Sequence, residues 1–356
     1  MNGGSVDVET TVGQVMGVRA YSVTGNITYY ASGIGVEGVN VYLSGKDSVS
    51  TISGASGEYG FYNLDVGSYD LSFSKNDDVN GITALDASYI LQYKVGIRSL
   101  SPNQLIAADA NNNGVVDSFD ASLILQYSVG LIELPFSGRN EIWAFKNSSQ
   151  SLGELSANYD AGTNQAILIG DVTGDWSNQS QGYALNNNPF GAIQVGKVNI
   201  INEQVIVPVM VKNGGADVYS VQFALRYSSD LAYAGYQLDS DAMVAVNSNA
   251  SGAIRVATAS ATDILDDELV YYFTFNIKSA ADSYFFAVSD SNIDEHYNIV
   301  NYANAIVTSE VINVTAEEIL AHYNETYLNG DISRYDLDGN GVVDMFDVIT
   351  LQNRAQ

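Results

Sequence analysis

An internal repeat constrains the fold of this 356-residue chain more than any other feature. Residues 86–96 read DASYILQYKVG and residues 120–130 read DASLILQYSVG, so nine of eleven positions are identical at an offset of 34 residues. A repeat of this kind predicts one supersecondary unit used twice. In each copy Asp and Ser precede Ile, Leu and Tyr, and Gly96 or Gly130 follows, which is the pattern of a short helix with a glycine stop. Because one such helix buries little apolar surface, we expect the two helices to pack on each other.

The loop before the second copy has the spacing of a calcium-binding loop. Such a loop places oxygen ligands at positions 1, 3, 5 and 9, a backbone carbonyl at position 7, an acid at position 12 and glycine at position 6. Residues 109–120, DANNNGVVDSFD, meet this pattern around Gly114. The expected ligands are Asp109, Asn111, Asn113, Val115, Asp117 and Asp120. Hard oxygen ligands without His or Cys favour calcium over a transition metal.

A second complete loop lies near the end of the chain. Residues 336–347, DLDGNGVVDMFD, follow the same frame, and the expected ligands are Asp336, Asp338, Asn340, Val342, Asp344 and Asp347. Both loops end in Asp, whereas the commonest calcium loop ends in a bidentate Glu. Since Asp is shorter, each loop must close more tightly or be ligated differently. The alternative for each loop is an Asx-rich turn that binds no metal.

A third copy of the loop is damaged. Residues 76–86, NDDVNGITALD, offer four weaker metal candidates, which are Asn76, Asp78, Asn80 and Asp86. The stretch from Gly81 to Asp86 is one residue shorter than the equivalent stretch of the intact loop, and Ala84 stands where a ligand is expected. We therefore favour a vestigial loop retained for its helix over a functional calcium site.

The segment GDVTGDWSN at residues 170–178 also begins like a calcium loop. It offers Asp171, Thr173 and Asp175 as weaker metal candidates. Trp176 occupies the glycine position, and no acid follows at position 12. These two departures make a complete loop within this segment the less favoured interpretation.

Most of the remaining chain is typical of short strands separated by turns. The expected strands of an N-terminal β-sandwich are residues 23–30, 38–45, 58–64 and 67–74, and those of a second strand-rich domain are residues 205–213, 218–229, 268–279 and 283–290. Two further strands are expected at residues 141–145 and 165–172. A helix is expected from Thr315, where Thr315 and Glu318 form a capping-box pattern.

Composition excludes several classes of function. The chain has 41 acidic and 14 basic residues and a formal net charge of -27, which argues against nucleic acid or an anionic membrane surface as a partner. It has no Cys and two His, so disulfides, thiolate metal sites and multi-His metal centres are not expected. No run reaches about 18 consecutive apolar residues, so no membrane-spanning helix is expected. No signal peptide is visible, so if the protein is secreted we expect this sequence to be a mature chain or a fragment.

The two loop-helix units at residues 76–134 resemble a dockerin module. The segments that carry the resemblance are DASYILQYKVG, DASLILQYSVG and GVVDSFD, with Asp at the twelfth loop position. The resemblance implies calcium binding and a partner-binding surface just before the twelfth ligand, at Ser118 and Phe119 and, in the first copy, at Leu85. Residues 313–356 resemble one further dockerin-type unit.

Two strand-rich regions resemble other families. Residues from about 190 to 312 resemble a cohesin, the β-sandwich partner of dockerins, through VIVPVMVKNGG, VQFALRYSSDL and ELVYYFTFNIK. Residues from about 21 to 74 are similar to carboxypeptidase-regulatory-like or B-type surface repeats. The predicted fold is therefore mainly β and multidomain, with two β-sandwich domains (Ig-like or jelly-roll-like) and small EF-hand-like helical modules. The expected divisions are residues 1–20, 21–74, 75–134, 135–189 as a strand-containing connector, 190–312 and 313–356.

Three functions remain in competition at this level. The first is a non-catalytic, calcium-stabilised extracellular or cell-surface protein that mediates cohesin–dockerin-type assembly, either head to tail into a filament or surface layer or by packing within one chain, which we slightly favour. The second is an adhesin or carbohydrate-binding accessory protein of a polysaccharide-degrading system. The third and least favoured is an enzyme with an unrecognised carboxylate pair.

Overall fold

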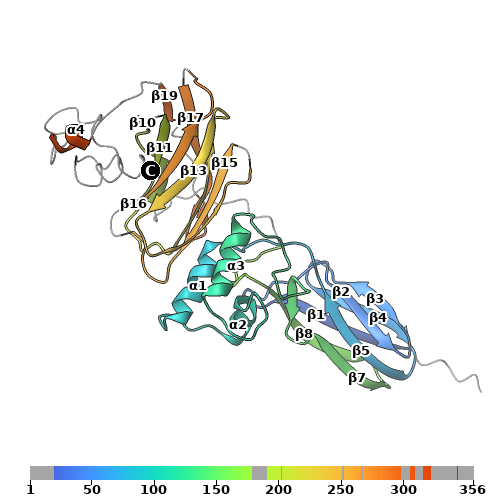
Figure 1. Cartoon of the computed structure of the whole chain (residues 1–356). Helices are drawn as coiled ribbons and strands as arrows, with labels where there is room; N and C mark the ends of the chain where they lie inside the picture. The colour runs from blue at the N-terminus through green and yellow to red at the C-terminus, as the bar shows by residue number, and fades with distance from the viewer. Residues whose placement is uncertain are drawn as a thin grey trace, which may run out of the picture. The chain divides into compact units, whose positions relative to one another are not determined.

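The computed structural model describes residues 20–178, 191–201, 203–250, 252–265, 268–281, 283–297, 305–308, 316–321 and 343. The chain divides into two compact units. The described part of the first unit consists of residues 20–29, 33–75 and 145–166, and the second unit contains residues 30–32, 76–144 and the chain from residue 167 onward. The fold is mainly β with a small helical module, as predicted (Figure 1).

The first unit is a β-sandwich of two four-stranded sheets, in the orders β4-β1-β8-β6 and β3-β2-β5-β7. Its strands are β1 (Tyr21–Tyr29), β2 (Asn40–Gly45), β3 (Val49–Ile52), β4 (Glu58–Leu64), β5 (Gly67–Ser74), β6 (Trp143–Phe145), β7 (Ser149–Leu155) and β8 (Tyr159–Leu168). Alternation along β4 buries Tyr59 and Phe61 and leaves Tyr62 exposed, as expected for a half-buried strand. Strands β6 to β8 follow the helical module in the chain, so that module is an insertion between β5 and β6.

The helical module contains α1 (Ala84–Lys94), α2 (Pro102–Ala108) and α3 (Ser118–Ser128). The two predicted repeat helices are confirmed as α1 and α3, and they pack on each other. Each begins slightly before the repeated segment, at an N-cap residue, Thr83 or Asp117, that forms a capping box with the acid three residues later. Each ends before a glycine with positive φ, +80° at Gly96 and +77° at Gly130.

The second unit also contains a β-sandwich. One sheet has the order β10-β11-β16-β13 with β9 beside β11, and the other has the order β14-β15-β12-β17-β18 with β19 beside β17. The strands are β9 (Gly191–Val195), β10 (Asn199–Ile201), β11 (Gln204–Asn213), β12 (Ser220–Tyr227), β13 (Leu231–Leu238), β14 (Met243–Asn247), β15 (Ala253–Ala259), β16 (Glu268–Ile277), β17 (Ser283–Ile293), β18 (His296–Tyr297) and β19 (Ala305–Thr308). A fourth helix, α4 (Ala316–Ala321), follows at the position predicted from Thr315.

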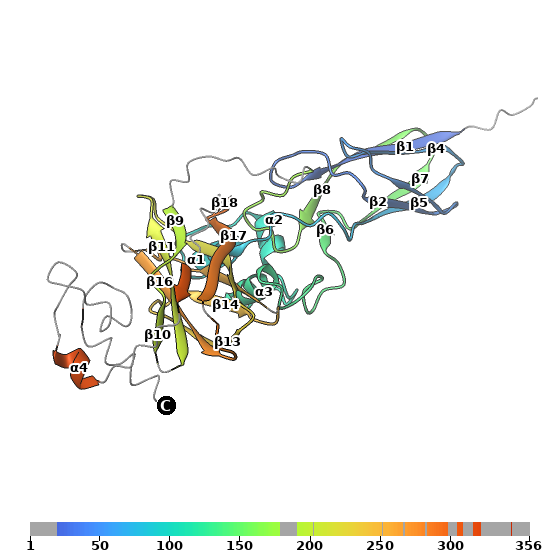
Figure 2. The same cartoon turned by 90° about the horizontal axis from the view of Figure 1, so that it is seen from above.

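The core of this second sandwich comes from alternate residues of facing strands. Along β11, Val205, Val207, Val209 and Val211 are fully buried. Phe223 of one sheet meets Phe273 of the other edge to face, with ring centroids 6.1 Å apart. Figure 2 shows helices α1 and α3 beside this sandwich, and both helices contact β15.

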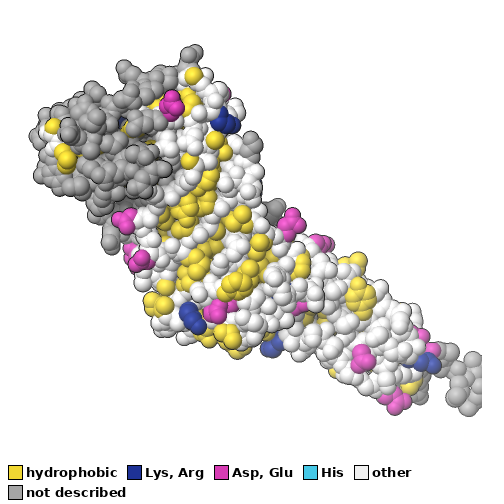
Figure 3. Space-filling view, viewed as in Figure 1, with side chains coloured by type: hydrophobic (Ala, Val, Ile, Leu, Met, Phe, Trp, Pro, Cys, Tyr) yellow, Lys and Arg dark blue, Asp and Glu magenta, His cyan; other side chains and the backbone are white. Residues whose placement is uncertain are grey.

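The surface of the chain is mixed. Figure 3 shows hydrophobic side chains gathered over the face of the second sandwich that the view presents, with few basic side chains among them. No helix in the described ranges is long and apolar enough to cross a membrane.

Replacing Phe273 with alanine tests this core. Because the ring is fully buried between two sheets, we expect Phe273→Ala to lower the free energy of unfolding of the second unit by about 3–5 kcal/mol. Chemical denaturation measures this change. The matched control is Gln237→Ala on neighbouring β13, whose side chain is exposed; it should change stability by less than about 0.5 kcal/mol. Equal effects of the two changes would contradict the packing described here.

Candidate functional site

The intact loop at residues 109–120 joins α2 to α3. Helix α2, which was not predicted, begins with the capping box Ser101 and Gln104 around Pro102 and ends at Asp109. Gly114 makes the sharp turn at loop position 6 with φ +81°. The backbone therefore takes the course that a calcium loop requires.

Two carboxylates organise this loop. Asp109 accepts hydrogen bonds from the N–H groups of Asn113 and Gly114, both at 3.0 Å. Asp120 is fully buried and accepts from the N–H groups of Asn111 at 3.2 Å and Asp117 at 3.0 Å. Burial raises the pKa of Asp120 above its ordinary value, although these backbone hydrogen bonds act to lower it.

The donor set of this loop fits calcium. Carboxylate, amide and backbone oxygens at the predicted positions are the ligands that Ca²⁺ prefers. In the described part of the chain, no three or more His, Asp or Glu side chains converge closely enough to mark a preformed metal cluster. Calcium loops of this type combine amide and carbonyl oxygens with carboxylates. The loop therefore fits calcium through the positions and the chemistry of its oxygen ligands, without a group of three converging acidic side chains.

Residues after the repeats support the loop. Arg139 is buried, and its Nε donates to the Asp109 carbonyl at 3.0 Å while Nη1 contacts Glu141 at 3.0 Å. A positive charge at the end of α2 is favourable, since the helix dipole is negative there. The backbone of Gly138 approaches the loop so closely that a Cβ would lie 2.2 Å from the Asn111 carbonyl oxygen.

The structure brings the two incomplete segments together at the start of α1. Asp86 accepts hydrogen bonds from the backbone N–H groups of Val172 at 2.7 Å and Thr173 at 2.8 Å. The hydroxyls of Thr83 and Thr173 both donate to Glu295, at 2.8 and 3.2 Å. Asp86, Asp171 and Asp175, predicted as parts of two different loops, thus lie near one another and near Glu295. We call these four residues the acidic cluster; their side chains do not converge as closely as those of a preformed metal site.

The remaining candidates of the damaged loop lie at the edge of this cluster. Asn76 and Asp78 are exposed. The backbone carbonyl of Asp78 accepts from the Trp176 indole at 2.9 Å. The side-chain amide of Asn80 donates to the Ser177 carbonyl and accepts from the Ser177 N–H, each at 3.1 Å. The main contacts of these residues are therefore with the segment 176–177.

The acidic cluster strongly disfavours full ionisation. Burial, followed by repulsion from Glu295 and Asp171, raises the pKa of Asp86 well above its ordinary value. Desolvation by the surrounding protein and then repulsion from Asp171 raise the pKa of Asp175 to about 7, although part of this side chain is exposed. Desolvation and then repulsion from Asp175 raise the pKa of Glu295 to about 8. A cation at this place would relieve the repulsion.

Glu295 was missed by sequence reasoning. It lies in the turn between β17 and β18, where Asp294 and Glu295 have φ of 47° and 62°. Its hydrogen-bond partner Thr83 is 212 residues away in the chain. No spacing rule links such distant residues, so the sequence contained no signal for it.

The predicted partner-binding residues differ in exposure. Ser118 is exposed, and Phe119 is 57% exposed. Leu85, the equivalent of Phe119 in the first copy, is half-buried. The second copy therefore presents its predicted surface to solvent, whereas the first copy does so only in part.

Both copies of the repeat lie against the second sandwich within the same compact unit. The hydrogen bonds between the helical module and that sandwich include Ala84 N–H to Gln222 Oε1 at 2.8 Å, Ser88 Oγ to the Ser260 carbonyl at 2.6 Å, and Asn247 Nδ2 to the Val129 carbonyl at 2.9 Å. Ala257 and Ala259 of β15 are fully buried. Small side chains on this strand allow the helices to approach the sheet closely.

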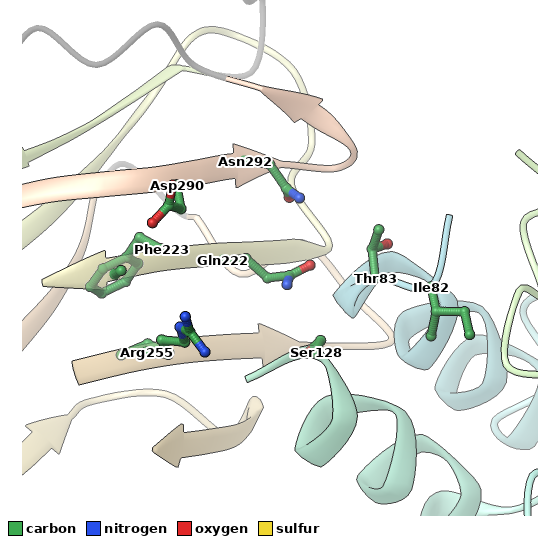
Figure 4. A pocket seen from close by; sticks show the side chains of 10 residues that line it. Ile82, Thr83, Ser128, Gln222, Phe223, Arg255, Asp290 and Asn292 are labelled. Atoms are coloured by element: carbon green, nitrogen blue, oxygen red, sulfur yellow. The ribbon is translucent and has the colours of Figure 1, made fainter. Parts of the chain in front are cut away.

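A cavity of about 230 Å³ lies between α1, α3 and strands β12, β15 and β17 (Figure 4). Figure 4 shows Gln222 pointing from β12 toward Thr83 at the start of α1. The cavity is smaller than the roughly 300 Å³ at which ligand pockets begin. We therefore interpret the cavity as a packing gap between the helical module and the second sandwich.

The predicted C-terminal loop, residues 336–347, lies outside the described residues except for Val343. The structure therefore does not describe its predicted ligands, which are Asp336, Asp338, Asn340, Val342, Asp344 and Asp347. The neighbouring Val343 is buried.

Comparison with known families assigns the helical module to a family. Residues 76–127 match the dockerin type I domain family. This confirms the dockerin resemblance of the helical module, which we now call the dockerin module. The expected likeness of residues 21–74 to a carboxypeptidase-regulatory-like repeat is not confirmed and stays a prediction. No protein in the curated set matches the chain.

Several solved structures are similar to parts of the chain. A cohesin module of a Clostridium perfringens family 33 glycoside hydrolase is 14% identical, with 35% of this chain and 98% of that chain covered and a TM-score of 0.30. The sixth cohesin of Acetivibrio cellulolyticus scaffoldin B, solved in complex with a dockerin mutant, is 17% identical, with 33% and 99% covered and a TM-score of 0.28. The major pilin SpaD of Corynebacterium diphtheriae is 10% identical, with 77% and 65% covered and a TM-score of 0.26. Similarities at this level carry no conclusion about function.

The acidic cluster predicts a pH dependence of stability in calcium-free buffer. Because folding raises the pKa of Glu295 to about 8, its protonated form stabilises the fold below its unfolded pKa of about 4.3, and that contribution is lost as pH rises through about 8. Glu295→Gln cannot ionise, so its melting temperature relative to wild type should rise between about pH 5 and pH 9.

The matched control for this measurement is Glu133→Gln, which changes an exposed carboxylate. Its melting temperature relative to wild type should stay constant over the same pH range. A flat difference for Glu295→Gln as well would contradict the raised pKa of Glu295.

Proposed function

We propose that this chain is a non-catalytic, calcium-stabilised modular protein of the cell exterior that takes part in protein–protein assembly through its dockerin module. The observation that carries the proposal is the match of residues 76–127 to the dockerin type I family, centred on a loop whose donors fit calcium. The module belongs to the same compact unit as the second sandwich.

Calcium would be held in the intact loop by six residues. These are Asp109, Asn111, Asn113, Val115 through its carbonyl, Asp117 and Asp120. The ion would neutralise carboxylates that otherwise repel each other and cross-link the loop to the start of α3. The residues themselves orient the loop, because Asp109 and Asp120 already accept its backbone N–H groups.

The second repeat supplies the surface for a partner. Phe119 and Val115 are 57% and 53% exposed in the loop beside the exposed Ser118. Exposed apolar side chains that lie together on an otherwise acidic chain support an interaction site here. The first repeat meets the chain's own sandwich through Ala84. The second repeat also meets this sandwich, at the end of α3. We propose that the exposed loop of the second repeat, at Phe119, faces a protein of the cohesin kind or a second copy of this chain.

One observation favours a second function, adhesion to a glycan. Tyr62 on β4 of the first unit is 67% exposed and borders a groove that also contains Asp47, Asn63 and Asp65. An exposed aromatic ring among polar side chains is a typical platform for a sugar. A glycan array with wild type and Tyr62→Ser would support this function if binding disappears in the variant.

Removing a ligand of the intact loop tests calcium binding. We expect Asp109→Asn to weaken calcium binding at one site by about tenfold or more, because ligand charge sets affinity in such loops. Isothermal titration calorimetry measures the change, and wild type should also melt at a lower temperature with a chelator. Asp70→Asn, an exposed change in the first unit, is the control. Identical titrations for wild type and Asp109→Asn would reject the loop as a calcium site.

Replacing Phe119 tests the partner surface. Because Phe119 is exposed, Phe119→Ser should leave the melting temperature and calcium affinity unchanged. It should weaken binding to a panel of cohesin modules, or self-association measured by analytical ultracentrifugation, by about tenfold or more. Tyr62→Ser, which removes an exposed aromatic ring from the other unit, is the control. Binding that survives Phe119→Ser undiminished would place the partner surface elsewhere.

A further inference from the structure

The hydrogen-bond pattern of the intact loop recurs at residues 171–176. In the intact loop, Asp109 at position 1 accepts from the backbone N–H groups four and five residues further on, each at 3.0 Å. Asp171 accepts from the N–H groups four and five residues further on as well, at 3.3 and 2.9 Å. By this register Asp171 takes position 1, Thr173 position 3 and Asp175 position 5.

The second half of the same pattern recurs at residues 83–86. Asp120 at position 12 accepts from the N–H three residues earlier at 3.0 Å and from Asn111 at position 3 of its own loop at 3.2 Å. Asp86 accepts from the N–H three residues earlier at 2.7 Å. Its other oxygen accepts from Thr173 at 2.8 Å, in a segment far along the chain. Asp86 therefore closes a loop whose first half belongs to a different segment.

The junction of the two segments explains why neither looked complete. A contiguous loop needs glycine at position 6 because the chain turns sharply there. The residue at this register is Trp176, which is tolerated because the loop does not continue through it. Gly81, with φ +84°, begins the other half, and a Cβ on it would lie 2.4 Å from Asp175 Oδ1 and 3.2 Å from Asp171 Oδ2. The absent side chain leaves a space lined by two carboxylates. The Asn80 amide holds the junction through its two hydrogen bonds to the Ser177 backbone.

We infer that the first calcium site of the dockerin module is assembled from residues 171–175 and 81–86, and that Glu295 of the second sandwich completes it. The inference rests on the proposed calcium binding of the module. The side-chain donors are Asp171, Thr173, Asp175, Thr83, Asp86 and Glu295, and the repeat offset of 34 residues places the Gly81 carbonyl at position 7. All are hard oxygen ligands, which suit calcium.

A calcium ion at this split site would connect three parts of the second unit. Residues 81–86 lead into α1, residues 171–175 follow β8, and Glu295 lies between β17 and β18. Glu295 already accepts hydrogen bonds from Thr83 and Thr173, one from each half of the loop. Calcium would therefore fasten the dockerin module to the second sandwich as well as fold the module.

Calorimetric calcium titration of the full chain tests the split site. Asp171→Asn and Asp109→Asn should each remove or weaken at least tenfold one of the binding events of wild type, and the double variant should lose two. The chain has two tryptophans, Trp143 and Trp176, whose rings stack edge to face at 5.0 Å. Because the backbone N–H of Trp176 donates to Asp171, calcium at this site should change tryptophan fluorescence. The change should vanish in Asp171→Asn and persist in Asp109→Asn.

The outcomes separate this inference from the proposed function. If Asp171→Asn keeps every calcium site and the fluorescence change while Asp109→Asn loses one site, the split site is wrong and the proposed function stands. If neither variant alters calcium binding, both fail.

Folding of the variants is checked by far-ultraviolet circular dichroism. If Asp171→Asn does not fold, Asp175→Asn repeats the test, because Asp175 is exposed. Asp175→Asn should weaken calcium binding, measured by tryptophan fluorescence, by about tenfold. Glu295→Gln should weaken the same site, whereas Glu133→Gln should not. An unchanged affinity in Asp175→Asn overturns the split site, and an unchanged affinity in Glu295→Gln removes Glu295 from it.

Discussion

A buried carboxylate at the start of each repeat helix holds the dockerin module together. Asp86 and Asp120 are both fully buried, and each performs two tasks with its two oxygens. One oxygen accepts the N–H of the helix N-cap residue, and the other accepts the N–H at position 3 of the calcium loop. Burying a carboxylate is costly unless hydrogen bonds or a cation compensate for the lost hydration. Helix start, loop closure and the proposed metal site therefore depend on the same side chain in each copy.

The dockerin module depends on residues beyond its family match. The match ends at residue 127, but Phe136 packs edge to face on Tyr127 at 5.9 Å, and Arg139 donates to the start of the intact loop. Trp143 and Trp176 stack against each other beside the first loop. On the other side, α1 bonds to the second sandwich through Gln222. The module is thus integrated into its unit, and its first repeat is engaged within the chain while Phe119 of the second stays exposed.

The sequence predicted the parts of this fold better than their connections. The repeat at an offset of 34 residues located α1 and α3, and alternation located the main strands, because both signals come from residues close in the chain. The intact loop at 109–120 was recognised for the same reason, and its ligands stay a prediction. The segment at 171–175 was judged incomplete because position 12 is supplied by Asp86, which precedes it in the chain. Glu295 could not be predicted at all, since only the turn after β17 brings it to Thr83. Helix α2 did carry a local signal, the Ser101–Gln104 capping box.

Hydrogen exchange at two backbone amides tests the central claim most directly. The N–H groups of Asn111 and Thr173 each donate to a position-12 carboxylate, Asp120 or Asp86. If calcium closes both loops, both amides should exchange slowly in calcium and much faster after chelation, as local opening becomes easier. Equal exchange rates with and without calcium at both amides would contradict the account of a calcium-stabilised module.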